Sequence, residues 1–213
     1  MKKHLTEGAG AFILTLAYLL MQTNASMRAS APATLGFLLF GLTLTVRNIA
    51  LAHFNPAVAM AGWVAGRVAP YELGSSLLAQ GVGALIAGAI ASWLLHSEQL
   101  HLPALYRFPQ QPSLEVVFVE LLGVALLVSA YWMLFSEKKE GEGEGMRAAG
   151  VGALFYAMLS LLEPFAAALN PAFLIGALVL GMQDAALVLT RLLGIALGIG
   201  LAASLLTTME REK

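Results

Sequence analysis

Apolar residues along this chain fall into long blocks that are separated by short polar stretches. A helix that crosses a bilayer needs about 20 residues. The blocks that reach or approach this length cover roughly residues 6–23, 33–52, 72–96, 113–135, 148–163 and 184–208. The first and fifth are short if only apolar residues are counted, so their ends must be polar or interfacial. The pattern predicts an all-α membrane protein with six transmembrane helices.

Two further apolar runs, residues 56–66 and 171–181, are too short to cross. A helix of about 11 residues, at ~1.5 Å per residue, spans only about half of a bilayer. Each run begins with a proline, which suits the first turn of a helix, and each proline follows an asparagine, a favoured N-cap residue. The sequence therefore predicts two re-entrant half-helices beside the six crossings.

The two halves of the chain carry matching motifs at nearly constant spacing, which indicates an internal duplication. The matched motifs are Glu7-x-x-Gly10 and Glu120-x-x-Gly123, Asn55-Pro56-Ala57 and Asn170-Pro171-Ala172, and Gly83 and Gly194. We expect a first repeat over 1–100, a loop over 101–112 and a second repeat over 113–213. Each half holds three crossings, an odd number, so the repeat must be inverted, with a substrate path at the interface of its halves.

Composition narrows the classes of function. The chain is 59% hydrophobic and 12% charged with a net charge of −1, so nothing suggests a nucleic-acid partner. It has no cysteine, and its four histidines are scattered. No metal cluster and no pairing of a nucleophile with a base is visible in the sequence. We therefore expect neither an enzyme nor a metal or cofactor site.

The basic residues indicate an orientation. If both termini are cytoplasmic, nine of the 12 Lys and Arg residues lie on the inner side. Positive charge prefers the cytoplasmic side of a membrane. The sequence therefore predicts a multi-pass protein of the cell membrane with cytoplasmic N- and C-termini.

These motifs resemble the aquaporin, or major intrinsic protein, family over nearly the whole chain. The segment His53-Phe54-Asn55-Pro56-Ala57-Val58 is similar to its first signature loop, and Ala79-Gln80 and Gly83-Ala84 match its third-helix pattern. The resemblance implies a homotetramer in the lipid bilayer with one pore in each subunit. It also implies that loop-supporting residues hold the two signature loops: Glu7, Glu120, His53 and Gln80.

The two signatures have a physical role of their own. Half-helices that meet at their N-termini place about half a positive charge each at the pore centre. Asn55 and Asn170 would face each other there, each capping its half-helix and offering side-chain N–H donors to a passing solute. We further expect Glu120 to be buried and to accept backbone hydrogen bonds from residues 165–170. A neutral hydrogen-bonding molecule would pass, whereas a cation would meet a barrier.

The selectivity filter departs from the family pattern. The residue after the second signature is normally an arginine that lines the narrowest constriction, and here it is Phe173. Counting from the signatures puts the other filter positions at Leu35, Met158 and Ala167. Such a ring has no side-chain hydrogen-bond donor. The aspartate of glycerol-conducting members is also absent, because Leu174 occupies its position.

A second departure lies in the sixth helix, where Arg191 occupies the position of a family proline. A guanidinium at membrane depth is costly unless it is paired or wet. We expect Arg191 to snorkel to the outer interface or to pair with Asp184 or Glu163. The alternative is an outer-pore charge that enters the constriction as a substitute donor.

The sequence favours a passive, cofactor-free channel for water or small neutral solutes, with an atypical apolar filter. One alternative is a channel tuned to ammonia or dissolved gases. Another is a largely closed structural or adhesive membrane protein of the same fold. A secondary transporter is less favoured, because no paired intramembrane carboxylates suited to ion coupling are visible.

Overall fold

The computed structural model describes residues 2–23, 25–46, 49, 52–97, 111–136 and 143–211. Within these ranges the chain is helical and has no strand. The long helices are α1 (Lys2–Met21), α2 (Ala25–Val46), α4 (Pro70–Ser97), α5 (Leu114–Ser136), α6 (Glu144–Leu161) and α8 (Ala185–Arg211). The short ones are α3 (Pro56–Val64), α7 (Pro171–Val179) and the 3₁₀ turn η2 (Glu163–Phe165). Residues 101–110 of the predicted loop lie outside the described ranges.

The predicted all-α membrane architecture is confirmed. In the described part of the chain, five helices are long and apolar enough to cross a membrane: α1, α2, α4, α5 and α8. The sixth long helix, α6, has 18 residues and opens with a charged turn that includes Glu144 and Arg147. This polar opening extends a block that is short in apolar residues, as the sequence predicts.

Four predicted boundaries are wrong. The helix predicted over 33–52 is α2, which begins at Ala25 and ends at Val46, so it includes a polar first turn that hydropathy does not select. The half-helices predicted to reach 66 and 181 end at Val64 and Val179. Gly66 and Gly181 stop them, because each follows the helix with a left-handed backbone at φ 74° and 75°.

Glycines allow the long helices to approach closely. α1 packs against α4, α5 against α8, and α2 against α6. A Cβ on Gly83 would overlap the carbonyl oxygen of Gly8, and a Cβ on Gly194 would overlap that of Val117. The same backbone approach therefore occurs in both halves of the chain, between the first and last long helix of each.

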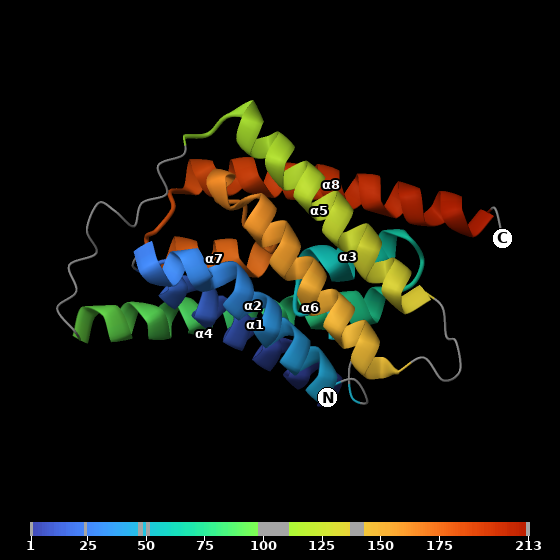
Figure 1. The fold of residues 1–213 in the computed structure, drawn as a ribbon, viewed down its shortest axis with the longest axis horizontal. Helices are drawn as coiled ribbons and strands as arrows, with labels where there is room; N and C mark the ends of the chain where they lie inside the picture. The colour runs from blue at the N-terminus through green and yellow to red at the C-terminus, as the bar shows by residue number, and fades with distance from the viewer. Residues whose placement is uncertain are drawn as a thin grey trace.

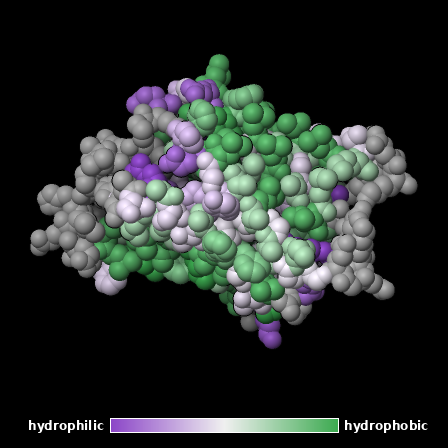
Figure 2. Space-filling view, in the orientation of Figure 1, coloured by the Kyte–Doolittle hydropathy of each residue, from purple (hydrophilic) through white to green (hydrophobic). Residues whose placement is uncertain are grey.

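The half-helices lie inside the bundle rather than on its surface. Figure 1 shows α3 and α7 between the long helices, and the first turn of α1 and the last turn of α8 both lie on the right-hand half of the view. Figure 2 shows hydrophobic residues over much of the flank, with hydrophilic ones mostly toward its margins. Large apolar side chains such as Phe37, Trp93 and Leu189 point outward. Such an apolar flank suits contact with lipid.

Candidate functional site

The two signature asparagines cap the half-helices. The side-chain oxygen of Asn55 accepts a hydrogen bond from the backbone N–H of Ala57 at 2.9 Å, and Asn170 accepts one from Ala172 at 2.9 Å. Pro56 and Pro171 occupy the first helical position in each case. The capping expected from the sequence is therefore confirmed. Both helix N-termini are stabilised by a side chain that also has N–H groups to donate.

The two signature loops are joined by a reciprocal pair of hydrogen bonds. Asn55 Nδ2 donates to the carbonyl oxygen of Leu169 at 3.0 Å, and Asn170 Nδ2 donates to that of Phe54 at 3.2 Å. Each asparagine thus caps its own half-helix and holds the residue that precedes the other asparagine. This arrangement fixes the two helix N-termini opposite each other.

The residue before each asparagine has a left-handed backbone. Phe54 has φ 47° and Leu169 has φ 57°. For a residue with a Cβ, this conformation costs roughly 1–2 kcal/mol. Gly10 and Gly123 make room for these two side chains, because a Cβ on Gly10 would overlap the Phe54 ring and one on Gly123 would overlap Leu169. The glycines of the two Glu-x-x-Gly motifs therefore accommodate the strained residues of the loops.

The glutamate of the first motif holds the first loop. Glu7 is buried, and its carboxylate accepts hydrogen bonds from the backbone N–H groups of His53 at 3.0 Å and Phe54 at 2.9 Å. Gln80 Nε2 donates to the same carboxylate at 2.9 Å. Three donors thus converge on one buried carboxylate, as a desolvated charge requires. The His53 ring packs against the rings of Tyr131 and Trp132.

Glu120 holds the second loop in the same way. It is fully buried and accepts hydrogen bonds from the backbone N–H groups of Ala168 at 2.8 Å and Leu169 at 3.0 Å. Its third donor is Arg191 Nη1 at 2.6 Å. The predicted burial of Glu120 is confirmed, and so is the predicted origin of its backbone donors.

The expected placement of Arg191 is wrong. Its side chain is buried and forms an ion pair with Glu120, so it neither snorkels nor pairs with Asp184 or Glu163. Asp184 instead caps the start of α8 by accepting a hydrogen bond from the backbone N–H of Leu187 at 2.7 Å. A buried carboxylate compensates a guanidinium at this depth, and Glu120 on α5 provides it.

A small cavity lies where the two half-helices meet. This central cavity has a volume of about 20 Å³. A cavity of this size holds about one water molecule. Asn55, Asn170 and Tyr131 contribute polar groups, and the rest of the wall is mostly apolar. Its lining residues are Leu14, Leu39, His53, Phe54, Asn55, Val58, Leu127, Tyr131, Val151, Leu154, Phe155 and Asn170.

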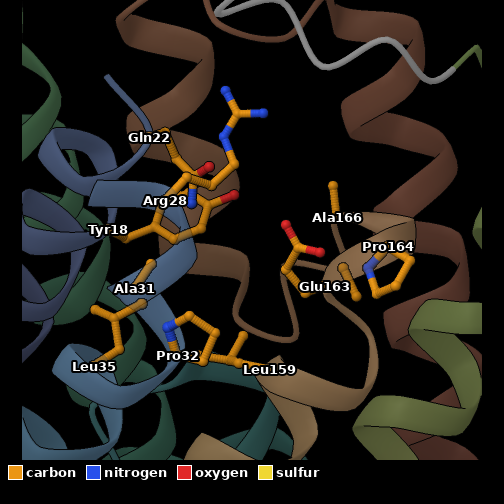
Figure 3. Close-up of a pocket in the computed structure, with 11 residues that line it drawn as sticks. Tyr18, Gln22, Arg28, Ala31, Pro32, Leu35, Leu159, Glu163, Pro164 and Ala166 are labelled. Carbon is orange, nitrogen blue, oxygen red and sulfur yellow. The ribbon is translucent and has the colours of Figure 1, made fainter. Parts of the chain in front are cut away.

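A larger pocket opens beyond the C-terminal half of α1. This Tyr18 pocket has a volume of about 240 Å³. Figure 3 shows Tyr18 and Arg28 on one side of it, Glu163 and Pro164 on the other, and Leu35 with Leu159 toward one end. Its lining residues are Tyr18, Gln22, Arg28, Ala31, Pro32, Leu35, Leu159, Glu163, Pro164, Ala166 and Ala167.

A third space, the Glu72 pocket, lies near the N-terminus of α1 and has a volume of about 30 Å³. His53 lines both this pocket and the central cavity. Helix α1 passes all three spaces in order, with Glu7 at the Glu72 pocket, Leu14 at the central cavity and Tyr18 at the Tyr18 pocket. The three spaces therefore follow one another along the bundle.

The structure brings two of the four predicted filter residues into one pocket. Leu35 and Ala167 line the Tyr18 pocket, and Leu159 lies there rather than Met158. One residue turns a helical side chain by about 100°. The count back from the second signature crosses the irregular segment that includes η2 and so loses the phase of α6. Phe173 is fully buried under Tyr18 and lines neither this pocket nor the central cavity.

The sequence analysis missed Tyr18. Its ring stacks on Phe173 with 4.4 Å between ring centroids and 10° between ring planes. A signal was present, because Tyr18 continues the helical face of α1 that carries Glu7 and Leu14. That face is buried throughout, and it points toward the three spaces described above.

Comparisons with known proteins agree with this geometry. The model of the family described as Major intrinsic protein matches residues 5–207. Among solved structures, the aquaglyceroporin from Plasmodium falciparum is similar, with a TM-score of 0.77 over 95% of this chain and 93% of that chain. The sequence identity is 18%, so this likeness establishes a shared fold and nothing finer.

Proposed function

The chain belongs to the major intrinsic protein family, and from this membership we propose that it is a passive channel for water and other small neutral solutes. The observation that carries the proposal is the succession of three spaces along α1, with the capped half-helices meeting at the middle one. A solute moving along this line meets the two asparagines at the centre, and both polar and apolar groups in the pockets on either side. No cofactor is needed for such passage.

Electrostatics favour neutral solutes over cations. The N-termini of α3 and α7 point toward the central cavity, and each contributes about half a positive charge. Glu7 and Glu120 offset this little at the cavity, because Arg191 balances the charge of Glu120 and Glu7 lines the Glu72 pocket rather than the central cavity. A cation at the central cavity would therefore meet a barrier that water or ammonia does not.

The wall between the Tyr18 pocket and the central cavity supports an atypical selectivity. Leu35, Leu159 and Ala167 bring apolar surface to the pocket where the family places an arginine-containing ring. A water molecule that loses one hydrogen bond without replacement pays roughly 1–3 kcal/mol. This favours as a second candidate function the conduction of ammonia or dissolved gases, which depend less on such bonds.

The remaining features follow the family pattern as proposals. We propose inverted repeats over 1–100 and 113–213, joined by 101–112, and a homotetramer in the cell membrane with both termini cytoplasmic. The first turn of α1 and the last turn of α8 lie on the same half of the view in Figure 1, which supports placing both termini on one side of the membrane.

Reconstitution into proteoliposomes tests the channel. Stopped-flow measurements would compare water, glycerol and ammonia flux with that of protein-free liposomes, and we expect water flux above the lipid background. Leu35→Trp is the blocked control, because a larger side chain would fill the Tyr18 pocket. Ammonia flux without water flux would favour the second candidate. Flux of neither, at matched protein content, would refute the channel and favour a closed structural protein.

A further inference from the structure

Tyr18 carries a buried hydroxyl that no group in the described part of the chain satisfies. The residue is 3% exposed, and its hydroxyl oxygen has no hydrogen-bond partner among the described residues. Buried tyrosine hydroxyls usually have a partner, because leaving one unpaired is costly. Tyr18 also lines the Tyr18 pocket, so a molecule in that pocket is the available partner.

The ring of Tyr18 is held in place, which fixes the position of its hydroxyl. One face stacks on Phe173, and Phe173 in turn contacts Phe155 with 6.2 Å between ring centroids. Phe173 occupies the position that follows the second signature and is fully buried. The aromatic side chain that replaces the family arginine therefore serves as a platform for Tyr18.

Tyr18 lies at the junction between the Tyr18 pocket and the central cavity. Residues four apart on a helix share a face. Leu14, Leu39 and Phe155 line the central cavity, and each lies four residues from a residue of the Tyr18 pocket, on α1, α2 and α6 respectively. The pocket residues of these three pairs are Tyr18, Leu35 and Leu159. One helical turn of α1, α2 and α6 thus separates the two spaces. Of the three pocket residues, Tyr18 is the one with a polar group.

We propose that the Tyr18 hydroxyl is the specificity-determining group of this junction, where it hydrogen-bonds a small neutral solute as it leaves the Tyr18 pocket for the central cavity. This role rests on the proposed channel function and refines it. A hydroxyl both donates and accepts, so it can hydrogen-bond water, ammonia or a small alcohol. It gives no advantage to a solute that forms no hydrogen bonds.

The figure and the lining residues agree with this role. Figure 3 shows the Tyr18 side chain directed into the space between α2 and the segment that carries Glu163, with Leu35 and Leu159 toward one end. Arg28, Glu163 and Gln22 add polar groups to the same pocket. A solute would pass from these polar groups to the Tyr18 hydroxyl and then to the asparagines of the central cavity.

Tyr18→Phe tests the proposal, because it removes one oxygen and keeps the ring that stacks on Phe173. In proteoliposomes of equal protein content, we expect water permeability to fall about tenfold and carbon dioxide permeability to change less than twofold. Tyr156→Phe is the matched control, since Tyr156 lies on α6 with 48% of its surface exposed. We expect this control to leave both permeabilities unchanged.

The outcomes separate the two proposals. If the wild-type chain conducts water and Tyr18→Phe conducts it equally well, the role of the hydroxyl is refuted and the channel stands. If both permeabilities fall together in Tyr18→Phe, the loss does not depend on hydrogen bonding to the solute, and the specificity role is refuted. If the wild-type chain conducts nothing, the channel itself is refuted, and the role of Tyr18 with it.

Discussion

Arg191 on α8 and Glu120 on α5 form a fully buried ion pair, with 2.6 Å between Nη1 and Oε1. The equivalent contact in the first half of the chain joins the Glu7 carboxylate to a neutral group, because the side-chain amide of Gln80 donates to Glu7. Gln80 and Arg191 each lie three residues before a glycine that packs on the partner helix, so they occupy equivalent positions. One half of the chain supports its loop with an amide, and the other supports it with a charge.

Replacing Arg191 with leucine should destabilise the fold. The change leaves the Glu120 carboxylate buried without its counter-charge, and removing one partner of a buried pair costs about 3–5 kcal/mol. We expect a lower midpoint of thermal unfolding in detergent micelles. Arg191→Gln supplies a neutral donor like Gln80. We expect it to lower the unfolding midpoint by less than half as much as Arg191→Leu does. Equal losses in the two variants would contradict this reading of the pair.

The charges of Glu120 and Arg191 should be energetically coupled. Glu120→Gln alone leaves the guanidinium buried without a counter-charge, while Glu120→Gln with Arg191→Gln removes both charges. We therefore expect the double variant to be more stable than Glu120→Gln alone, with a coupling free energy of about 1–3 kcal/mol. Unfolding midpoints of all four combinations measure it. Single losses that simply add would show that the two residues act independently.

Gly10 should be intolerant of a methyl group. A Cβ there would overlap the Phe54 ring, and overpacking of this kind costs about 1–3 kcal/mol. We expect Gly10→Ala to lower both the unfolding midpoint and the water permeability, because displacing Phe54 moves the carbonyl that Asn170 holds. The control is Gly41→Ala on α2, where a Cβ meets nothing within 4 Å.

Gly10→Ala and Gly41→Ala should therefore change the stability of the protein in different directions. In the interior of a helix, alanine is favoured over glycine by about 1 kcal/mol, so Gly41→Ala should be neutral or slightly stabilising. A Gly10→Ala variant as stable and as permeable as Gly41→Ala would mean that the first loop does not depend on contact with α1.

Local sequence sufficed for the capped half-helices, because an Asn-Pro pair determines short-range geometry. The hold of Glu7 and Glu120 on the loops followed from the family resemblance and the repeat, since these hydrogen bonds join residues 46 to 49 positions apart. Counting residues across the irregular segment around η2 gave the wrong helical position on α6. Leu159 rather than Met158 lies at the Tyr18 pocket.

The partner of Arg191 depends on which helices pack together, and proximity along the chain does not reveal this. Asp184 and Glu163 are near in sequence or in expected depth, but Glu120 faces Arg191 because α5 packs on α8. The repeat itself held the missing information. Gln80 and Arg191 each lie three residues before one of the matched glycines Gly83 and Gly194, and Glu7 and Glu120 open the two matched Glu-x-x-Gly motifs.

Restoring an arginine at Phe173 should not produce a water-selective pore. The sequence alone suggests that Phe173→Arg would supply the missing donor if the site could hold a guanidinium. In the structure the side chain of Phe173 is fully buried, stacked under Tyr18 and close to Phe155. A cation there gains about 2 kcal/mol from the rings. The buried carboxylate of Glu120 already pairs with Arg191. The change therefore introduces a charge without a partner and removes the platform of Tyr18.

We expect Phe173→Arg to lower the unfolding midpoint and to leave water permeability at or below that of the wild-type chain. Phe173→Leu is the control, because it keeps the site apolar and should cost less, as a smaller hydrophobic residue leaves a cavity but no charge. Unfolding in detergent and stopped-flow water flux in proteoliposomes measure the two effects. A stable Phe173→Arg protein with raised water permeability would show that the guanidinium can displace Tyr18 and reach the Tyr18 pocket, in which case the apolar junction is set by this one residue rather than by the packing of three helices.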